Sequence, residues 1–219
     1  IGKSVSVKDY NTFLDRNEST GYKFIWENEN VYIIEMANRE HEAVVSVLFK
    51  CFDRPNNSVI HGPIEIYGQP YHYNPIGHGE KIAPDIAVCP SNAHVLRPLI
   101  RHPGPLLGRA HARIICEVAT AQGFDLWNTK CETWMHEEYV RCVLGIKLGS
   151  KRNIGTTRGA PAESVLSINA NLAGVYVTEW DFSTIQYNNN TSTLTGCNAS
   201  NLNAFQVTIP ISDVFYDPP

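Results

Sequence analysis

The chain has 219 residues, of which 43% are hydrophobic and 18% are charged, and its formal net charge is −4. This length fits one domain with a sizeable core. The acidic balance counts against a protein that holds DNA tightly by surface charge alone. No apolar run reaches about 18 residues, so we expect no membrane-spanning helix and no membrane partner.

The six cysteines show neither C-x-x-C spacing nor zinc-finger spacing with histidine. Several lie within apolar patterns, where cysteine behaves as a small hydrophobe. We therefore expect reduced thiols in an intracellular protein, cytoplasmic or nuclear and not secreted. Matches to N-x-S/T arise by chance in a chain this rich in asparagine.

The first quarter of the chain alternates between helix and strand patterns. Residues 6–9 form a capping box and predict a helix over 7–16. Two apolar runs around a polar turn predict a hairpin over 24–34. Asn38 is a suitable N-cap, followed by acidic residues in the first turn, for a helix over 38–52.

The rest of the chain favours strands. The pattern predicts, in order, strands at 59–60, 64–67 and 82–88, a Pro/Gly-rich loop over 90–110, a strand over 112–119, a helix over 125–139, a strand over 140–148, a loop over 149–161, strands at 165–168 and 175–180, a loose loop over 187–203 and a strand over 205–209. We expect an α/β fold, with a mixed central sheet flanked by helices over 1–148. A β-rich C-terminal portion over 149–219 completes the same domain.

Two carboxylates lie inside apolar runs that read as buried strands. Asp85 follows Pro84 in the run 82–88, and Glu117 lies in the run 112–119. Buried carboxylates are costly unless they are paired, hydrogen-bonded or bound to a metal. Mg²⁺ or Mn²⁺ suits oxygen ligands of this kind, and Lys130 could supply a third group that orients a water and stabilises negative charge. The pattern indicates a metal-dependent hydrolytic site.

Each of these residues also has a structural interpretation. Asp85 could cap a turn or pair with an arginine, and Glu117 could form a buried ion pair with Arg113 or Arg109. Lys130 could cover neighbouring aromatic surface with its aliphatic stem.

Further polar residues near these segments are candidates for substrate contact. Arg101 and Arg109 belong to the main local concentration of positive charge, the loop over 97–111, and could grip phosphates, although a solvated loop has the same composition. Arg113, on the following predicted strand, is a further candidate for substrate contact. Gln122 could contact a metal-bound water or the substrate. Asp125 is expected to be the N-cap of its helix.

The order of these features resembles that of the PD-(D/E)XK nucleases: an acidic residue on a first helix, Pro-Asp on a strand, Glu on the next strand, then a helix. More narrowly, the chain is similar to the Uma2 group of restriction-endonuclease-like proteins. The matching segments are the N-terminal helix, Met36 to Glu42, Pro84 to Val88, Ile115 to Val118, Asp125 to Lys130, and Phe205 to Phe215.

The resemblance implies a Mg²⁺- or Mn²⁺-dependent endonuclease that cuts phosphodiesters, of DNA more readily than RNA, by metal-activated water. Asp85 and Glu117 would hold the metal, Lys130 would assist the water, and Glu42 or His41 would complete the ligand set. The role of His41 follows from a resemblance to viral cap-snatching endonucleases, which share the order His, Pro-Asp, Glu, Lys.

One departure keeps two other hypotheses open. Ala119 stands where the strict motif has a lysine, and Lys130 on the following helix is the nearest substitute. The chain could therefore be a catalytically decayed nuclease-like fold that acts as a nucleic-acid-binding or protein-interaction module, or a structural domain whose carboxylates form buried salt bridges. Because a nuclease with little positive charge needs help to find its substrate, we also expect a homodimer or a fused targeting module.

Overall fold

The computed structural model describes residues 2–17, 22–36, 38–95, 110–149, 163–171, 174–181, 185–188, 191–194 and 206–216. The helices are α1 (Val7–Arg16), α2 (Arg39–Asp53), α3 (Phe124–Trp134) and α4 (Ile211–Val214), and a 3-10 turn, η1 (Arg54–Asn56), follows α2. The strands are β1 (Tyr22–Glu27), β2 (Asn30–Met36), β3 (Ile64–Gly68), β4 (His72–Tyr73), β5 (Lys81–Ile82), β6 (Ile86–Pro90), β7 (Ile114–Ala119), β8 (Cys142–Leu148), β9 (Glu163–Asn171), β10 (Gly174–Asp181), β11 (Ile185–Asn188) and β12 (Thr191–Leu194).

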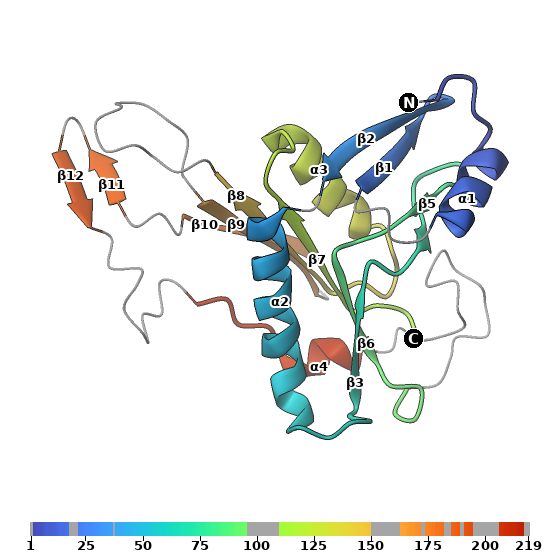
Figure 1. Ribbon diagram of the computed structural model, residues 1–219. Helices are drawn as coiled ribbons and strands as arrows, with labels where there is room; N and C mark the ends of the chain where they lie inside the picture. Colours follow the sequence, from blue (N-terminus) through green and yellow to red (C-terminus); the bar gives the residue numbers. More distant parts are fainter. Residues whose placement is uncertain are drawn as a thin grey trace.

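Six strands form a mixed sheet in the order β10-β9-β8-β7-β6-β3. β7 and β8 are parallel and α3 connects them, whereas the other neighbouring strands of this sheet are antiparallel. Figure 1 shows α2 running along this sheet, with α1 and the β1–β2 hairpin at one end and the β11–β12 hairpin apart from it. The predicted α/β fold with a mixed central sheet flanked by helices is confirmed.

Alternate side chains of β6 and β7 face opposite sides of the sheet and build two apolar layers. Ala87 and Ile115 belong to the layer that packs against Trp127 and Trp134 of α3. The layer against α2 and α4 contains Ile64, Ile86, Val88, Ile114, Cys116, Cys142, Leu144 and Val214. Because both faces of these strands are covered, their sequences read as nearly continuous apolar runs.

The N-terminal hairpin and α1 form one unit beside the sheet. β1 and β2 pair only with each other among the named strands, and their apolar side chains pack on α1. The indole Nε1 of Trp26 donates to the carbonyl of Val5 at 2.7 Å, and the hydroxyl of Tyr10 donates to the carbonyl of Phe24 at 3.2 Å. The hairpin is thus held by α1, and it is free of the ladder hydrogen bonds of the central sheet.

The local patterns at the start of the chain predicted these elements correctly. The helix over 7–16, the hairpin over 24–34 and the N-cap at Asn38 are confirmed. In the capping box, Ser6 Oγ accepts a hydrogen bond from the backbone N–H of Asp9 at 3.1 Å. These elements are decided by neighbouring residues, which is why the sequence pattern suffices.

The predicted helix over 125–139 is shorter in the structure, where α3 ends at Trp134 and turns follow. The turns carry Glu137 into the interior, where its Oε1 lies 3.2 Å from Nδ1 of His72. This is a tertiary contact that no local pattern predicts. Asp125 is not the N-cap: Gly123 holds that position, and Asp125 lies in the first turn, where the helix dipole favours an acid.

The predicted strand at 59–60 is wrong. Asn57 and Ser58 adopt positive φ values of 52° and 63°, so the chain turns before this apolar pair. Ile60 is 91% exposed. A short apolar pair without alternation or a partner strand does not specify a strand.

In the C-terminal portion, the strands predicted at 165–168 and 175–180 are confirmed within β9 and β10. β9 pairs along its length with β8, so this portion extends the central sheet. The loop predicted over 187–203 is wrong at its start, where β11 and β12 form a hairpin; residues 195–203 lie outside the described residues.

The strand predicted over 205–209 is also wrong. Phe205 lies outside the described residues, and residues 206–210 are not in a strand. Val207 and Ile209 pack on the apolar layer beneath α2. Their alternation therefore reflects burial of one side of an irregular segment, which gives the same period as a strand.

Within the described residues, Cys51, Cys89, Cys116, Cys131 and Cys142 are free thiols. No helix in the described ranges has the length and apolar character needed to cross a membrane.

Candidate active site

The Asp85 and Glu117 carboxylates are brought together by the pairing of β6 with β7. Ile86 pairs with Cys116, and the backbone N–H of Asp85 donates to the carbonyl of Cys116 at 3.1 Å. Continuing the register by one residue places Asp85 opposite Glu117. Both side chains are buried. Like charges directly opposite each other destabilise a sheet, so this pair requires positive charge nearby.

Two lysines from other elements supply that charge. Lys23 on β1 places its Nζ 2.5 Å from Oδ1 of Asp85 and 3.8 Å from Oε2 of Glu117. Lys130 on α3 places its Nζ 2.9 Å from the same Oε2 and donates to the carbonyl of Ala83 at 3.3 Å. Sequence reasoning expected Lys130 but missed Lys23. No local sequence pattern singles out Lys23, because its contact with the carboxylates is made between distant segments.

His41 is a buried neighbour of Asp85. The side chain of Asn38 caps α2 by accepting from the backbone N–H of His41 at 2.8 Å, which fixes His41 at the start of the helix. Its Nε2 lies 3.0 Å from Oδ1 of Asp85, and its Nδ1 lies 3.2 Å from Oε1 of Glu42. Glu42 is 57% exposed and contacts the ring nitrogen that faces away from Asp85. The structure brings His41 to the carboxylate pair and does not bring Glu42 there.

The outer oxygens of both carboxylates are also hydrogen-bonded. Oδ2 of Asp85 accepts from the backbone N–H of Val118 at 2.7 Å, and Oε1 of Glu117 accepts from Nε1 of Trp134 at 2.6 Å. Burial alone would raise the pKa of Asp85. The charge of Lys23, the hydrogen bond from His41 and the charge of Lys130 outweigh burial and hold this pKa well below its usual range. Asp85 is therefore an anion throughout the physiological pH range.

Arg113, one of the predicted arginines, does not contact this pair. Arg113 is buried, and its guanidinium donates to the carbonyls of Tyr216 and His111, at 2.7 Å for His111. The guanidinium also lies 4.8 Å from the ring centroid of Tyr139. This environment favours neither a substrate contact nor the alternative ion pair with Glu117. Arg101 and Arg109 lie outside the described residues.

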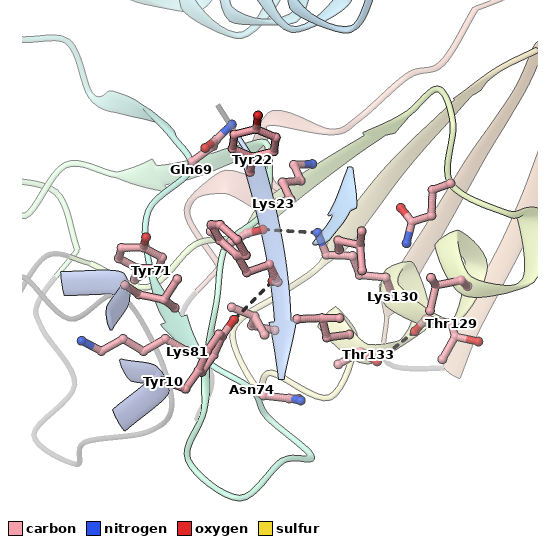
Figure 2. Close-up of a pocket in the computed structure, with 18 of the residues that line it drawn as sticks. Tyr10, Tyr22, Lys23, Gln69, Tyr71, Asn74, Lys81, Thr129, Lys130 and Thr133 are labelled. Carbon is pink, nitrogen blue, oxygen red and sulfur yellow. Dashed lines mark hydrogen bonds between the residues drawn. The ribbon is translucent and has the colours of Figure 1, made fainter. Parts of the chain in front are cut away.

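A pocket of about 150 Å³ adjoins the charged centre and runs around β1. Lys23, Lys130 and Gln122 are among its lining residues, and Gln122 is buried. Figure 2 shows side chains on both sides of β1, with Tyr10, Tyr71 and Lys81 on one side and Thr129, Lys130 and Thr133 on the other. The pocket gives a ligand access to the residues beside the carboxylates.

The donor chemistry fits a hard divalent cation, because carboxylate oxygens are what Mg²⁺ and Mn²⁺ prefer. The arrangement also draws positive charge to the position between Asp85 and Glu117, where the ammonium of Lys23 lies. As the side chains stand, no group of three His, Cys, Asp or Glu side chains in the described ranges could hold a metal ion. A cation at this position would have to displace the ammonium of Lys23.

Comparisons with known proteins bear on the fold. No protein-family profile matches the chain, and no curated protein matches its sequence. A solved structure from Anabaena variabilis, described as a "putative nuclease belonging to DUF820", is similar with a TM-score of 0.52 and 11% sequence identity. The similarity covers 96% of this chain and 97% of that one. At this identity the similarity concerns the fold alone, and the chain shares the fold of that protein.

Proposed function

We propose that this protein is a metal-dependent endonuclease of the PD-(D/E)XK type that hydrolyses phosphodiester bonds. The observation that carries the proposal is the placement of Asp85 opposite Glu117, together with the hydrogen bond from Lys130 to the Glu117 carboxylate. Similarity of fold to a protein described as a "putative nuclease" supports it. The resemblance of the ordered motifs to the Uma2 group supports it independently.

In this proposal Asp85 and Glu117 would hold Mg²⁺ or Mn²⁺, and His41 would become a third ligand once the side chains rearrange around the ion. When bound, the metal supplies a Lewis acid for the phosphoryl oxygen and acidifies a water. Lys130 points its ammonium at Glu117 from the pocket side, where it can orient the attacking water and stabilise the developing negative charge. Trp134 fixes the rotamer of Glu117 by donating to its other oxygen.

We propose DNA ahead of RNA as the substrate on the basis of the Uma2 resemblance. The net charge of −4 gives little electrostatic attraction to a nucleic acid. A homodimer or a fused targeting module would raise the local concentration of substrate. A monomer of this chain that cleaves plasmid DNA efficiently by itself would contradict that part of the proposal.

A thermal-shift titration with Mn²⁺, followed by plasmid cleavage, tests the function. We expect Mn²⁺ to stabilise the wild-type protein and not the Asp85→Asn variant. We expect Lys130→Gln to retain the Mn²⁺ shift and to lose cleavage by about 100-fold, the scale of one electrostatic group at a reacting centre. Lys8→Gln, which changes an exposed lysine on α1, is the matched control and should cleave normally. Absence of any shift at millimolar Mn²⁺ would remove the metal site.

The position of Lys23 favours a second candidate function. Lys23 and Lys130 together balance the two buried carboxylates, so the centre is neutral without a divalent ion. A nuclease-like fold with this internal charge balance could act as a nucleic-acid-binding module without chemistry. Binding of an oligonucleotide, with neither an Mn²⁺ shift nor cleavage, would select this candidate over the enzyme.

A further inference from the structure

We propose that the pocket around β1 is a subsite for one unpaired nucleobase, with the phosphate of that nucleotide near Lys23 and Lys130. The inference rests on the proposed function and narrows its substrate class to nucleic acid that carries at least one unstacked base.

Size and lining suit a planar ring. The pocket has a volume of about 150 Å³, and Ile25, Ile34 and Leu126 contribute apolar surface to it. An apolar cavity of about 150 Å³ is large enough to bind benzene. A six-membered ring of a nucleobase therefore fits, held between apolar side chains as extruded bases are.

The amide of Gln122 calls for a polar partner within the pocket. Gln122 is 7% exposed and lines the pocket, and its Nε2 has no hydrogen-bond partner in the described part of the chain. A buried donor without a partner costs free energy. The ring nitrogens and carbonyl oxygens of a nucleobase are acceptors that would satisfy it, whereas a purely apolar ligand would not.

Two ammonium groups, which also pair with the buried carboxylates, border the same pocket. Lys23 and Lys130 line it, and both also lie within ion-pair distance of Glu117. Figure 2 shows these two lysines reaching from different elements, Lys23 from β1 and Lys130 from α3. A nucleotide joins a planar ring that has an acceptor edge to an anionic group, and so matches both features. This placement sets the adjoining phosphodiester beside the carboxylate pair.

Contact with an unpaired base would supply affinity that this protein, with its net negative charge, does not gain from the phosphates alone. Proteins that bind single strands gain affinity from contacts with the exposed faces of bases, in addition to the backbone charge. A paired base inside a duplex stack cannot enter an enclosed pocket without being extruded. An acidic protein with a ring-sized pocket therefore suits single-stranded or locally opened nucleic acid better than intact duplex.

Fluorescence anisotropy with a labelled octathymidylate tests the proposal, performed in EDTA so that cleavage plays no part. The comparison probe is the same oligonucleotide with every base removed from the sugar backbone, which keeps the phosphates. Thr129→Phe fills the pocket from an exposed position on α3, where Thr129 contributes its backbone carbonyl to a hydrogen bond with Thr133. Asn128→Phe introduces the same side chain at the adjacent position of α3, which does not line the pocket, and is the matched control.

We expect the wild-type protein to prefer the octathymidylate over the abasic probe by about tenfold, as for the loss of one base contact. Thr129→Phe should bind both probes with equal affinity, and Asn128→Phe should keep the preference. Equal wild-type affinity for the two probes, no binding of either, tighter binding of a blunt duplex, or an unchanged preference in Thr129→Phe would each overturn the proposal. A preference that persists in a protein that never cleaves with Mn²⁺ supports the subsite and removes the nuclease function. Cleavage with Mn²⁺ by a protein that binds both probes equally would support the nuclease function and remove the subsite.

Discussion

Replacing Lys23 with Gln tests the charge balance of the centre, because it removes the ammonium between the two carboxylates while keeping a polar side chain. In the structure this ammonium lies 2.5 Å from Asp85 and 3.8 Å from Glu117. With an effective dielectric constant of about 20, Coulomb's law gives an attraction of about 7 kcal/mol for the first pair and about 4 kcal/mol for the second. Both are upper limits, since moving an ammonium out of water costs several kcal/mol.

Lys130 and His41 remain beside the carboxylates in the variant, so part of the compensation survives. Removing one member of a buried ion pair costs about 3–5 kcal/mol, and we expect the lower end, about 3 kcal/mol of the free energy of unfolding. For a chain of this size that lowers the melting temperature by about 6–12 °C. Mn²⁺ should bind Lys23→Gln more tightly than wild type, because in the variant the ion displaces no ammonium. A tenfold tighter ion adds about 1.4 kcal/mol of stabilisation at saturating concentrations.

Urea denaturation in EDTA and in millimolar Mn²⁺ measures both effects, with the exposed-site variant Lys8→Gln as control. The control should remain within about 0.5 kcal/mol of wild type. If Lys23→Gln is as stable as Lys8→Gln in EDTA, the lysine does not compensate the buried carboxylates. If Mn²⁺ stabilises wild type and Lys23→Gln equally, the lysine does not occupy the position of the cation.

Three further predictions concern the surroundings of this centre. The pKa of Asp85 is lowered in the folded state, so its contribution to stability is fully present above the unfolded pKa of about 4 and is lost as the pH falls below it; urea denaturation between pH 5 and 3 should show a steeper loss for wild type than for Asp85→Asn, and parallel curves would refute this. Trp134→Phe removes the donor to Oε1 of Glu117 and should cost about 2–4 kcal/mol in urea denaturation, with a loss below 1 kcal/mol counting against a buried anion there. Gly145→Ala would place a methyl group 2.5 Å from the ring of Trp127 and should cost about 1–3 kcal/mol by thermal denaturation; a variant as stable as wild type would show that the ring can shift.

Local sequence signals predicted the N-terminal part of the fold and most of the apolar strands because their causes are local. The strand predicted over 82–88 is instead divided into β5 and β6, with residues 83–85 outside both. The capping box fixes the start of α1, and the Asn38 side chain fixes the start of α2. The same signals failed where burial imitates a strand, as at Val207 and Ile209. They also failed at the end of α3, where Glu137 turns inward to His72.

Within the candidate site, the residues found by sequence were those whose type conflicts with their surroundings. Asp85 and Glu117 stand out because a carboxylate in a buried strand needs compensation, and the structure places them opposite each other. Lys130 was chosen for its position on the next helix, and it contacts Glu117. Glu42 and Arg113 were expected nearby, yet one lies beyond His41 and the other holds the C-terminal segment.

The sequence alone indicated that two acids are buried, because each stands among apolar neighbours; Glu117 lies within β7 and Asp85 directly before β6. Tertiary structure alone decided which cations meet them. The contact of Lys23 with Asp85 depends on how the β1–β2 hairpin packs against β6 and β7, since the hairpin does not pair with the strands of the central sheet. This position is set by packing of distant segments, α1 beneath the hairpin and α3 beside it. The sequence around residue 23 therefore contains no local pattern that predicts it.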